Sequence, residues 1–457
     1  MFGALVAFFV IARCTALDAR HGSRDHHSIK RDVCVVGGGS SGTYAAVRLQ
    51  QMGHSVVLIE REARLGGHVN TYRDPVTNTT ADYGVQIFSN RTVLRNFFKH
   101  FEIPLVKLPQ GSGMPKTTNF RTAEPVKASD PSAEQLAQAL LAYDAQLAKY
   151  PGLADGFILP SPVPEDLLLD FGDFLRKYDL EVLANLFFAY NQGAGNILAQ
   201  PTLYMMKYFD HIQVQDISQS AFVMNGLSDN QLLYDRAQKE PGKNVLLDTD
   251  ILKIRRSRKG HVVRVMTPGG PKTIHAKKSL LAIPPTVSNL KFLDLDPAET
   301  IVFSKLNGSS YWDAVVQDIG IPNTQTVRNI DPEAALDVPA LPALYSLSST
   351  KFDKTHFAYY GSPAKASEDE VRSTILDTLR RLRGGSSQDA KIVELHDHTP
   401  FMLTAPKEDV AAGFYDKMLA LQGHKNTWWT GAAWQLQATA QLWNYTECNV
   451  LPRLLAG

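Results

Sequence analysis

Cysteine is scarce in this chain, since only three of its 457 residues are cysteines. So few thiols exclude a scaffold built on disulfides and a zinc ribbon or finger. Charge of one sign is lacking too, because 47 Lys and Arg face 46 Asp and Glu, for a formal net charge of +1. A nearly neutral chain has no basic field to drive binding to nucleic acid or to an anionic membrane. We therefore expect a globular protein with no nucleic-acid partner.

Long apolar runs are also missing, apart from residues 1–11. That run is too short to span a bilayer, so no transmembrane segment is predicted. It fits the apolar part of a signal peptide, with small residues after it for cleavage. We therefore predict a signal peptide over residues 1–19, a linker or pro-segment over residues 20–31, and a secreted protein or one of the secretory pathway. A buried N-terminal element is the alternative.

Four Asn-x-Ser/Thr sequons accompany this pattern, at Asn78, Asn90, Asn307 and Asn444. Each can carry a glycan only if it is exposed in a secretory chain. The predicted protein is therefore a glycoprotein.

A nucleotide-binding pattern follows the linker. Residues 32–36 form an apolar β-rich run that leads into Gly37-Gly38-Gly39-Ser40-Ser41-Gly42. Residues 43–52 can form a helix, and a second apolar strand over residues 55–59 ends at Glu60. This order of strand, glycine loop, helix, strand and acid is typical of a dinucleotide-binding fold.

Each residue type in this loop has a physical role. Gly37 allows the tight turn, Gly39 lets the backbone approach a pyrophosphate, and Gly42 lets the helix pack close to the strand. The helix N-terminus, where Ser41 lies, offers free N–H groups and a partial positive charge to the phosphates. Glu60 can accept hydrogen bonds from ribose hydroxyls.

The next segment carries a family resemblance. Arg64-Leu65-Gly66-Gly67-His68-Val69-Asn70-Thr71 resembles the Arg-x-Gly-Gly-Arg-x-x-Thr signature of the flavin-containing amine oxidoreductases, the monoamine oxidase-like superfamily. The resemblance implies that FAD is the cofactor. It also implies that Arg64, Gly66, Gly67 and His68 fold over its pyrophosphate and ribityl chain. His68 stands where the family usually has arginine, so one cationic flavin contact becomes weaker or pH-dependent.

Four later segments resemble the same family in the same order. Residues 82–87 match the segment beneath the flavin ring, which implies contacts from Gly84, Val85 and Gln86. Ile251 matches the position whose backbone holds the adenine, and residues 278–285 match the strand that returns to the substrate domain.

The C-terminal stretch resembles the last flavin-binding element of the family. Its strand and turn end at Gly431, and Asn444-Tyr445-Thr446-Glu447 would open the final helix, aimed at the flavin. This implies flavin contacts from Gly431, Tyr445 and Thr446. A glycan on Asn444 would clash there, so we predict that this sequon stays unmodified.

The predicted fold class is α/β, with a Rossmann-like FAD-binding domain of the GR2 type interleaved with an α+β substrate or cap domain. Helical patterns over residues 132–150, 164–190 and 202–209 belong to the cap. The FAD-binding domain takes residues 32–85, 225–285 and 400–457, and the cap takes residues 86–224 and 286–399.

Two branches of the superfamily share a further segment with the chain. It reads Gly413-Phe414-Tyr415, Gln422-Gly423 and Asn426-Thr427. It is similar to segments in the secreted β-cyclopiazonate dehydrogenase-like oxidoreductases, which the chain resembles most, and in FAD-dependent double-bond isomerases of polyunsaturated fatty acids. Both point to chemistry on a carbon skeleton.

Catalytic candidates are few. Residues 309–316 lack the active-site lysine of monoamine oxidases, so the resemblance does not extend to plain primary-amine oxidation. His396 and His398 share one face of a strand-like stretch and could act as general base, because imidazole titrates near neutrality. Tyr445 could form an aromatic wall facing the flavin, and Gln86 could line the cavity. No metal cluster is predicted.

The function we expect is FAD-dependent oxidation by hydride abstraction. The substrate would be a hydrophobic small molecule, such as an amine or indole intermediate of secondary metabolism, and molecular oxygen would reoxidise the flavin to give peroxide. One alternative is a redox-neutral isomerase that moves a double bond in a fatty-acid-like substrate. The other is an FAD-binding protein without turnover.

Overall fold

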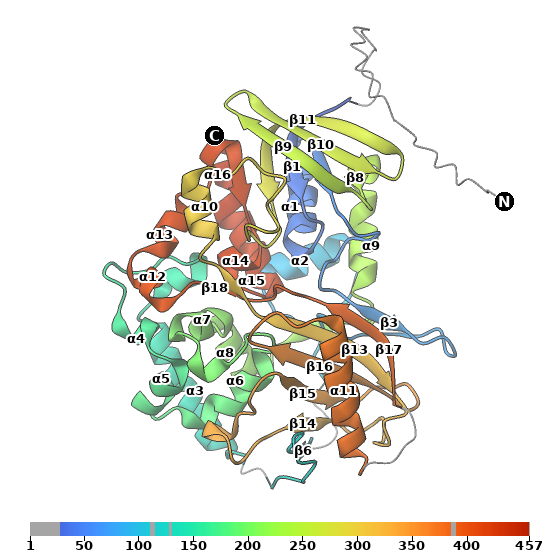
Figure 1. The fold of residues 1–457 in the computed structure, drawn as a ribbon, viewed down its shortest axis with the longest axis vertical. Coiled ribbons are helices and arrows are strands. Elements are labelled where there is room, and N and C mark those ends of the chain that lie inside the picture. The colour runs from blue at the N-terminus through green and yellow to red at the C-terminus, as the bar shows by residue number, and fades with distance from the viewer. Residues whose placement is uncertain (1–27, 110–114, 128–129, 385–389, 457) are drawn as a thin grey trace, which may run out of the picture.

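The computed structural model describes residues 28–109, 115–127, 130–384 and 390–456. The predicted signal peptide and residues 20–27 of the predicted linker lie outside these residues. Two large sheets, one above the other in Figure 1, organise the described chain, and helices cover both.

The first sheet has the strand order β8-β2-β1-β11-β10-β9, and β19 also pairs with β11. Its strands β8, β2, β1, β11 and β19 run parallel, whereas β10 pairs antiparallel with β9 and β11. The bounds are β1 Ser28–Val36, β2 Val56–Ile59, β8 Val245–Leu246, β9 Asp250–Ser257, β10 Gly260–Thr267, β11 Gly270–Leu281 and β19 Thr427–Trp429. β1 starts earlier than predicted, because Ser28 already pairs with Thr273, so residues 28–31 belong to this sheet.

Helix α1 (Ser40–Gln51) joins β1 to β2, as the glycine pattern predicted. It packs so close to the strand that a Cβ on Gly42 would lie 1.8 Å from the carbonyl oxygen of Gly37. Only glycine fits there, so the predicted packing role of Gly42 is confirmed.

The second sheet has the order β17-β13-β16-β15-β14-β6. Because successive side chains of a strand point to opposite faces, Ala314 and Val316 pack under α11 (Glu368–Leu382), while Asp313 and Val315 face the other way. The bounds are β6 Lys116–Thr118, β13 Ser310–Gln317, β14 Val327–Asn329, β15 Ala343–Ser348, β16 Thr355–Ser362 and β17 Lys391–Asp397.

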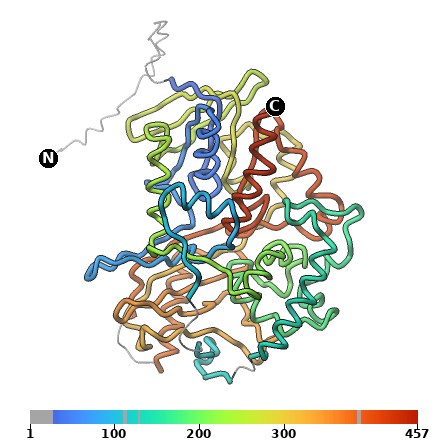
Figure 2. Tube along the Cα trace, turned by 180° about the vertical axis from the view of Figure 1, so that it is seen from behind, coloured from blue at the N-terminus to red at the C-terminus, as the bar shows by residue number. Residues whose placement is uncertain are grey.

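Several helices form the cap, which Figure 2 shows in teal and green beside the orange strands of the second sheet. The single helical run predicted over residues 164–190 is wrong. Leu169 and Asp170 adopt extended backbone angles, and Asp179 has a φ of 54°, so the helix breaks at these points. The bounds are α3 Ala133–Leu147, α4 Glu165–Leu168, α5 Phe171–Lys177, α6 Ala184–Tyr190, α7 Thr202–Tyr208 and α8 His211–Ser218.

The C-terminal helix begins earlier than predicted, and this changes which residues it presents. α14 (Ala432–Gln435) follows β19, and α15 (Thr439–Tyr445) continues through a π-helical turn into α16 (Leu451–Ala456). Tyr445 therefore lies at the end of α15, not at a helix start. The rings of Tyr44 and Trp443 stack at 5.2 Å and fix α15 against α1.

The remaining elements connect or cover these layers. They are α2 Thr92–His100, α9 Gln231–Lys239, α10 Pro297–Phe303, α12 Lys407–Ala411, α13 Phe414–Leu419, β3 Thr71–Arg73, β4 Thr80–Asp82, β5 Leu105–Lys107, β7 Val223–Asn225, β12 Asn307–Gly308 and β18 Leu403–Thr404. No helix in the described ranges combines the length and the apolar character needed to cross a bilayer. Cys34 is a buried free thiol.

Candidate active site

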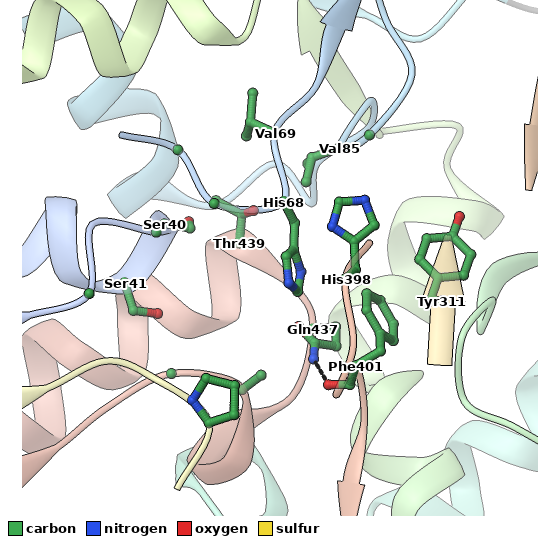
Figure 3. A pocket seen from close by; sticks show the side chains of 18 of the residues that line it. Ser40, Ser41, His68, Val69, Val85, Tyr311, His398, Phe401, Gln437 and Thr439 are labelled. Carbon is green, nitrogen blue, oxygen red and sulfur yellow. Dashed lines mark hydrogen bonds between the residues drawn. The ribbon is translucent and has the colours of Figure 1, made fainter. Parts of the chain in front are cut away.

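A cavity of about 1220 Å³ extends from the glycine loop after β1 to the second sheet and the cap. Figure 3 shows Ser40 and Ser41 on one side of it and His68, His398, Phe401 and Tyr311 towards the other. We name the part of the cavity on the side of His398 and Tyr311 the aromatic chamber. It is defined by Gln86, Tyr190, Gln192, Tyr208, Tyr311 and Tyr359.

Most residues predicted to hold the cofactor line this cavity. They are Gly37, Gly39, Ser41, Glu60, Arg64, Gly66, Gly67, His68, Gly84, Val85, Gln86, Ile251 and Gly431. They come from separate parts of the chain and meet here because β1, β2, β9 and β19 belong to one sheet. Their contacts with the cofactor itself stay predictions.

The glycine loop has the shape of a cradle. A Cβ on Gly39 would meet nothing closer than the Cα of Gly67, at 3.8 Å, so the protein leaves open space above this backbone. Glu60 is held at the edge of the cradle, because its Oε2 accepts the N–H of Gly38 at 2.5 Å and its Oε1 accepts that of Glu62 at 2.9 Å. The open backbone, the helix N-terminus and this carboxylate fit the pyrophosphate and ribose of a dinucleotide.

Of the described residues predicted to touch the cofactor, Gly42, Tyr445 and Thr446 lie outside the lining. The ring of Tyr445 is buried beside Gly156. The hydroxyl of Thr446 donates to the carbonyl of Leu442 at 2.8 Å. Since α15 begins at Thr439, these two side chains point elsewhere, and the placement of Tyr445 at the flavin is corrected.

The residues that reach the cavity in place of Tyr445 lie just before and at the start of α15. Gln437, Ala438 and Thr439 line it. The amide of Gln437 donates to the carbonyl of Phe401, which fixes this segment against the loop after β17.

A buried acid and imidazole meet where the cavity reaches β13. Asp313 and His398 are almost fully buried, and Nε2 of His398 lies 3.0 Å from Oδ2 of Asp313. A carboxylate can only accept, so this contact places a proton on Nε2 and leaves Nδ1 as the basic nitrogen of neutral His398. The pair has the geometry of an oriented general base.

Asn70 links this pair to the cofactor loop. Its Nδ2 lies 3.1 Å from Oδ1 of Asp313 and donates to it, and 3.3 Å from Nε2 of His398. Its Oδ1 accepts from Nη2 of Arg64 at 2.7 Å. The positive charge of Arg64 therefore faces the negative charge of Asp313 across one neutral amide, which offsets the cost of burying the carboxylate.

His68 lies between the cofactor loop and this pair. Its ring centroid is 4.5 Å from that of His398 and 5.5 Å from that of Phe401. Burial, and then the neighbouring His398 and Arg64 side chains, hold the pKa of His68 well below its usual value. The imidazole is therefore neutral at physiological pH, which agrees with the expectation that the cationic flavin contact is weaker here.

The other two catalytic candidates are also found at the cavity. His396 is half-exposed, its Nε2 lies 3.9 Å from Oε2 of Glu394, and burial lowers its pKa. Gln86 donates from its amide to the hydroxyl of Tyr359. His398 is thus the candidate that a buried carboxylate orients.

Sequence reasoning missed Asp313, Asn70 and Tyr311. Asp313 interrupts the apolar run Tyr311–Val316, and a lone acid within such a run was the available signal. Lys305, the lysine just before this strand in the sequence, lies on the surface and pairs with Asp409 at 3.2 Å. Asn70 and Tyr311 carried no comparable signal.

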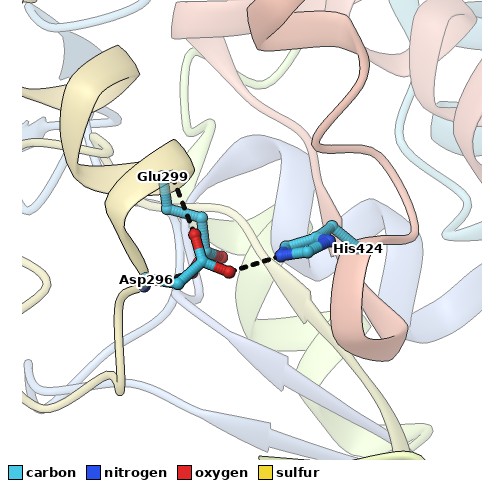
Figure 4. A group of neighbouring side chains, drawn as sticks. All are labelled: Asp296, Glu299 and His424. Carbon is cyan, nitrogen blue, oxygen red and sulfur yellow. Dashed lines mark hydrogen bonds and ion pairs between the residues drawn. The ribbon is translucent and has the colours of Figure 1, made fainter.

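A second cluster of ligating side chains lies apart from this cavity. Asp296, Glu299 and His424 place one ligand atom each within 4.8 Å of one another (Figure 4). Their charges already have partners, since Arg256 binds Glu299 at 2.5 Å and Lys425 binds Asp296 at 3.2 Å. The cluster fixes α10 to the loop before β19 and needs no metal ion for charge balance.

Comparison with known proteins gives consistent matches. Residues 40–441 match the family described as flavin containing amine oxidoreductase. The FAD-dependent oxidoreductase oblC of Cochliobolus heterostrophus is 38% identical over 444 residues, which cover 94% of this chain and 92% of that protein. The beta-cyclopiazonate dehydrogenase of Aspergillus oryzae is 32% identical over 447 residues, with 97% and 95% covered.

A solved structure supports the fold. The CLA-producing fatty acid isomerase from P. acnes superposes with a TM-score of 0.75 at 18% identity, covering 93% of this chain and 98% of that one. The predicted fold class, with a Rossmann-like domain and a substrate domain, is confirmed.

Proposed function

Because the chain belongs to the flavin-containing amine oxidoreductases and uses FAD, we propose that it takes a hydride from a hydrophobic small molecule, such as an amine or indole intermediate. One observation carries the proposal: a single cavity joins the nucleotide cradle at Gly37–Gly39 to the aromatic chamber, where the Asp313–His398 pair lies. FAD, when bound, supplies the hydride acceptor. The protein supplies the cavity that holds the substrate and a base that is already oriented.

His398 is the base in this proposal. Its Nδ1 accepts the proton that the substrate releases, and Asp313 stabilises the imidazolium that forms 3.0 Å away. Molecular oxygen serves as the terminal acceptor and is reduced to peroxide.

Anaerobic mixing tests the proposal. FAD-loaded protein would be mixed with a panel of aromatic amines, indoles and phenols, with free FAD as the control. Lasting bleaching of the bound flavin by a panel member, reversed by air with formation of peroxide, is the expected result. Turnover that moves a double bond without bleaching or oxygen uptake would establish the isomerase instead, and a flavin that responds to no compound would favour a binding protein.

We also propose that the protein is secreted. The sequons at Asn78, Asn90 and Asn307 are exposed, whereas Asn444 is half-buried on α15. Glycopeptide mass spectrometry of protein from a secretory host should find sugar at exposed sequons and none at Asn444. Protein retained inside the cells, with its first residues intact, would contradict secretion.

A further inference from the structure

The aromatic chamber presents neutral hydrogen-bonding groups to a substrate. Burial raises the pKa of Tyr190, Tyr208, Tyr311 and Tyr359, so all four phenols stay protonated at physiological pH. Two of them are ordered by amide side chains: Tyr311 donates to Gln192 at 3.0 Å, and Tyr359 accepts from Gln86. The chamber therefore offers polarity without charge.

Asp313 does not add a free negative charge to the chamber. It is the buried carboxylate of the lining, and its oxygens already face His398 at 3.0 Å and Asn70 at 3.1 Å. The other acids near the chamber, Glu368 and Asp397, are exposed. A substrate ammonium would thus lose its water with no free carboxylate to receive it.

Besides being uncharged, the substrate must match Nδ1 of His398, the ring nitrogen that does not face Asp313. Nε2 faces Asp313, so Nδ1 remains to accept a hydrogen bond and then a proton. His68, whose ring is 4.5 Å away, is neutral and does not repel the imidazolium that results. A substrate that fits this nitrogen carries a proton on oxygen or nitrogen.

Resting on the proposed function, we propose that the substrate is an uncharged aromatic molecule with an O–H or N–H group, as in a phenol or an indole, and not an ammonium ion. The O–H or N–H proton goes to Nδ1 of His398, and a C–H bond conjugated with that group breaks with its electron pair going to FAD as hydride. The substrate loses two hydrogens and gains one π bond, so electrons and protons balance.

Equilibrium binding of three probes to the FAD-loaded protein tests this substrate class. 2-Naphthol has the hydroxyl, 2-methoxynaphthalene lacks the donor, and 2-(aminomethyl)naphthalene carries a positive charge at neutral pH. We expect 2-naphthol to bind about tenfold more tightly than the methoxy compound, for one hydrogen bond. It should bind roughly a hundredfold more tightly than the ammonium compound, because the charged ammonium group must lose its water on binding.

Two variants test whether the Asp313–His398 pair causes the preference for 2-naphthol. The double variant Asp313→Asn with His398→Leu removes both members of the pair, so neither charge is left buried alone, and it should erase the advantage of 2-naphthol over the methoxy compound. His275→Gln, at an exposed position of β11, is the matched control and should keep it. FAD content and thermal unfolding would verify that each variant is folded.

Two results would overturn the inference: an ammonium probe that binds as tightly as 2-naphthol, or a double variant that still discriminates between the two neutral probes. Binding does not require hydride transfer. A flavin that no compound reduces, combined with the expected order of binding, would therefore refute the proposed function and leave the substrate class standing.

Discussion

Replacing Gly39 by alanine should separate cofactor binding from folding. Gly39 has φ −67° and ψ −172°, angles that alanine adopts without strain. The new Cβ would lie 3.8 Å from its nearest neighbour, Gly67, which is ordinary contact. The free energy of unfolding of the FAD-free protein should therefore change by less than about 1 kcal/mol, since losing the freedom of glycine in the unfolded chain acts in the stabilising direction.

The effect on FAD should be large, because the added methyl group occupies the space that the cradle leaves open. Moving the pyrophosphate away from this backbone would weaken one or two charge-assisted hydrogen bonds, each worth about 1.5 kcal/mol or more. We expect the dissociation constant of FAD to rise by about ten- to a hundredfold. Titration of FAD-free protein, followed by flavin fluorescence, would measure it.

Gly42→Ala is the matched comparison. Its Cβ would collide with Gly37 at 1.8 Å, so helix α1 must move and stability should fall by about 1–3 kcal/mol. If Gly39→Ala bound FAD as wild type does, the assignment of the loop as the pyrophosphate cradle would be refuted.

Three further predictions concern ionisable side chains that are buried or half-buried. Asp313→Asn should slow flavin reduction by about 10²–10⁴ in rapid mixing, because the new amide no longer holds the proton of His398 on Nε2; an unchanged rate would exclude His398 as the base. Glu299→Gln should cost about 1.5–3 kcal/mol in chemical denaturation, since Arg256 would lose one of its two carboxylate partners and keep Asp294, and a loss below about 1 kcal/mol would contradict the role of this pair. Burial raises the pKa of Asp82 from 3.8 to about 7, so the folded chain retains a proton that the unfolded chain releases. Stability should fall as pH rises from about 4 to about 7, and Asp82→Asn should flatten that part of the profile measured by thermal unfolding.

The succession of residues within one short segment was enough to predict the nucleotide cradle. Gly37, Gly39, Gly42 and Glu60 act within one strand-helix-strand unit, where each role follows from backbone geometry. The start of α15 was misread because Asn444 and Thr446 have the residue types of a helix cap, whereas the true cap, Ala438, makes no side-chain hydrogen bond.

The pairing of Asp313 with His398 could not be predicted from local sequence patterns. Asn70 and Asp313 are 243 positions apart, and they meet only when the second sheet lies against the cofactor loop. Periodicity indicates that one face of β13 is buried, but it does not reveal which distant side chains lie opposite. His396 and His398 looked equivalent for the same reason, until the fold buried one and left the other half-exposed.

The most direct test of this site is a diffraction structure of the FAD-loaded protein with 2-naphthol bound. We predict that the dinucleotide follows Gly37–Gly39 and Glu60, that the flavin ring ends beside His398, and that the naphthol hydroxyl lies within hydrogen-bonding distance of Nδ1 of His398. A flavin ring that ends away from His398, or a probe bound outside the aromatic chamber, would contradict it.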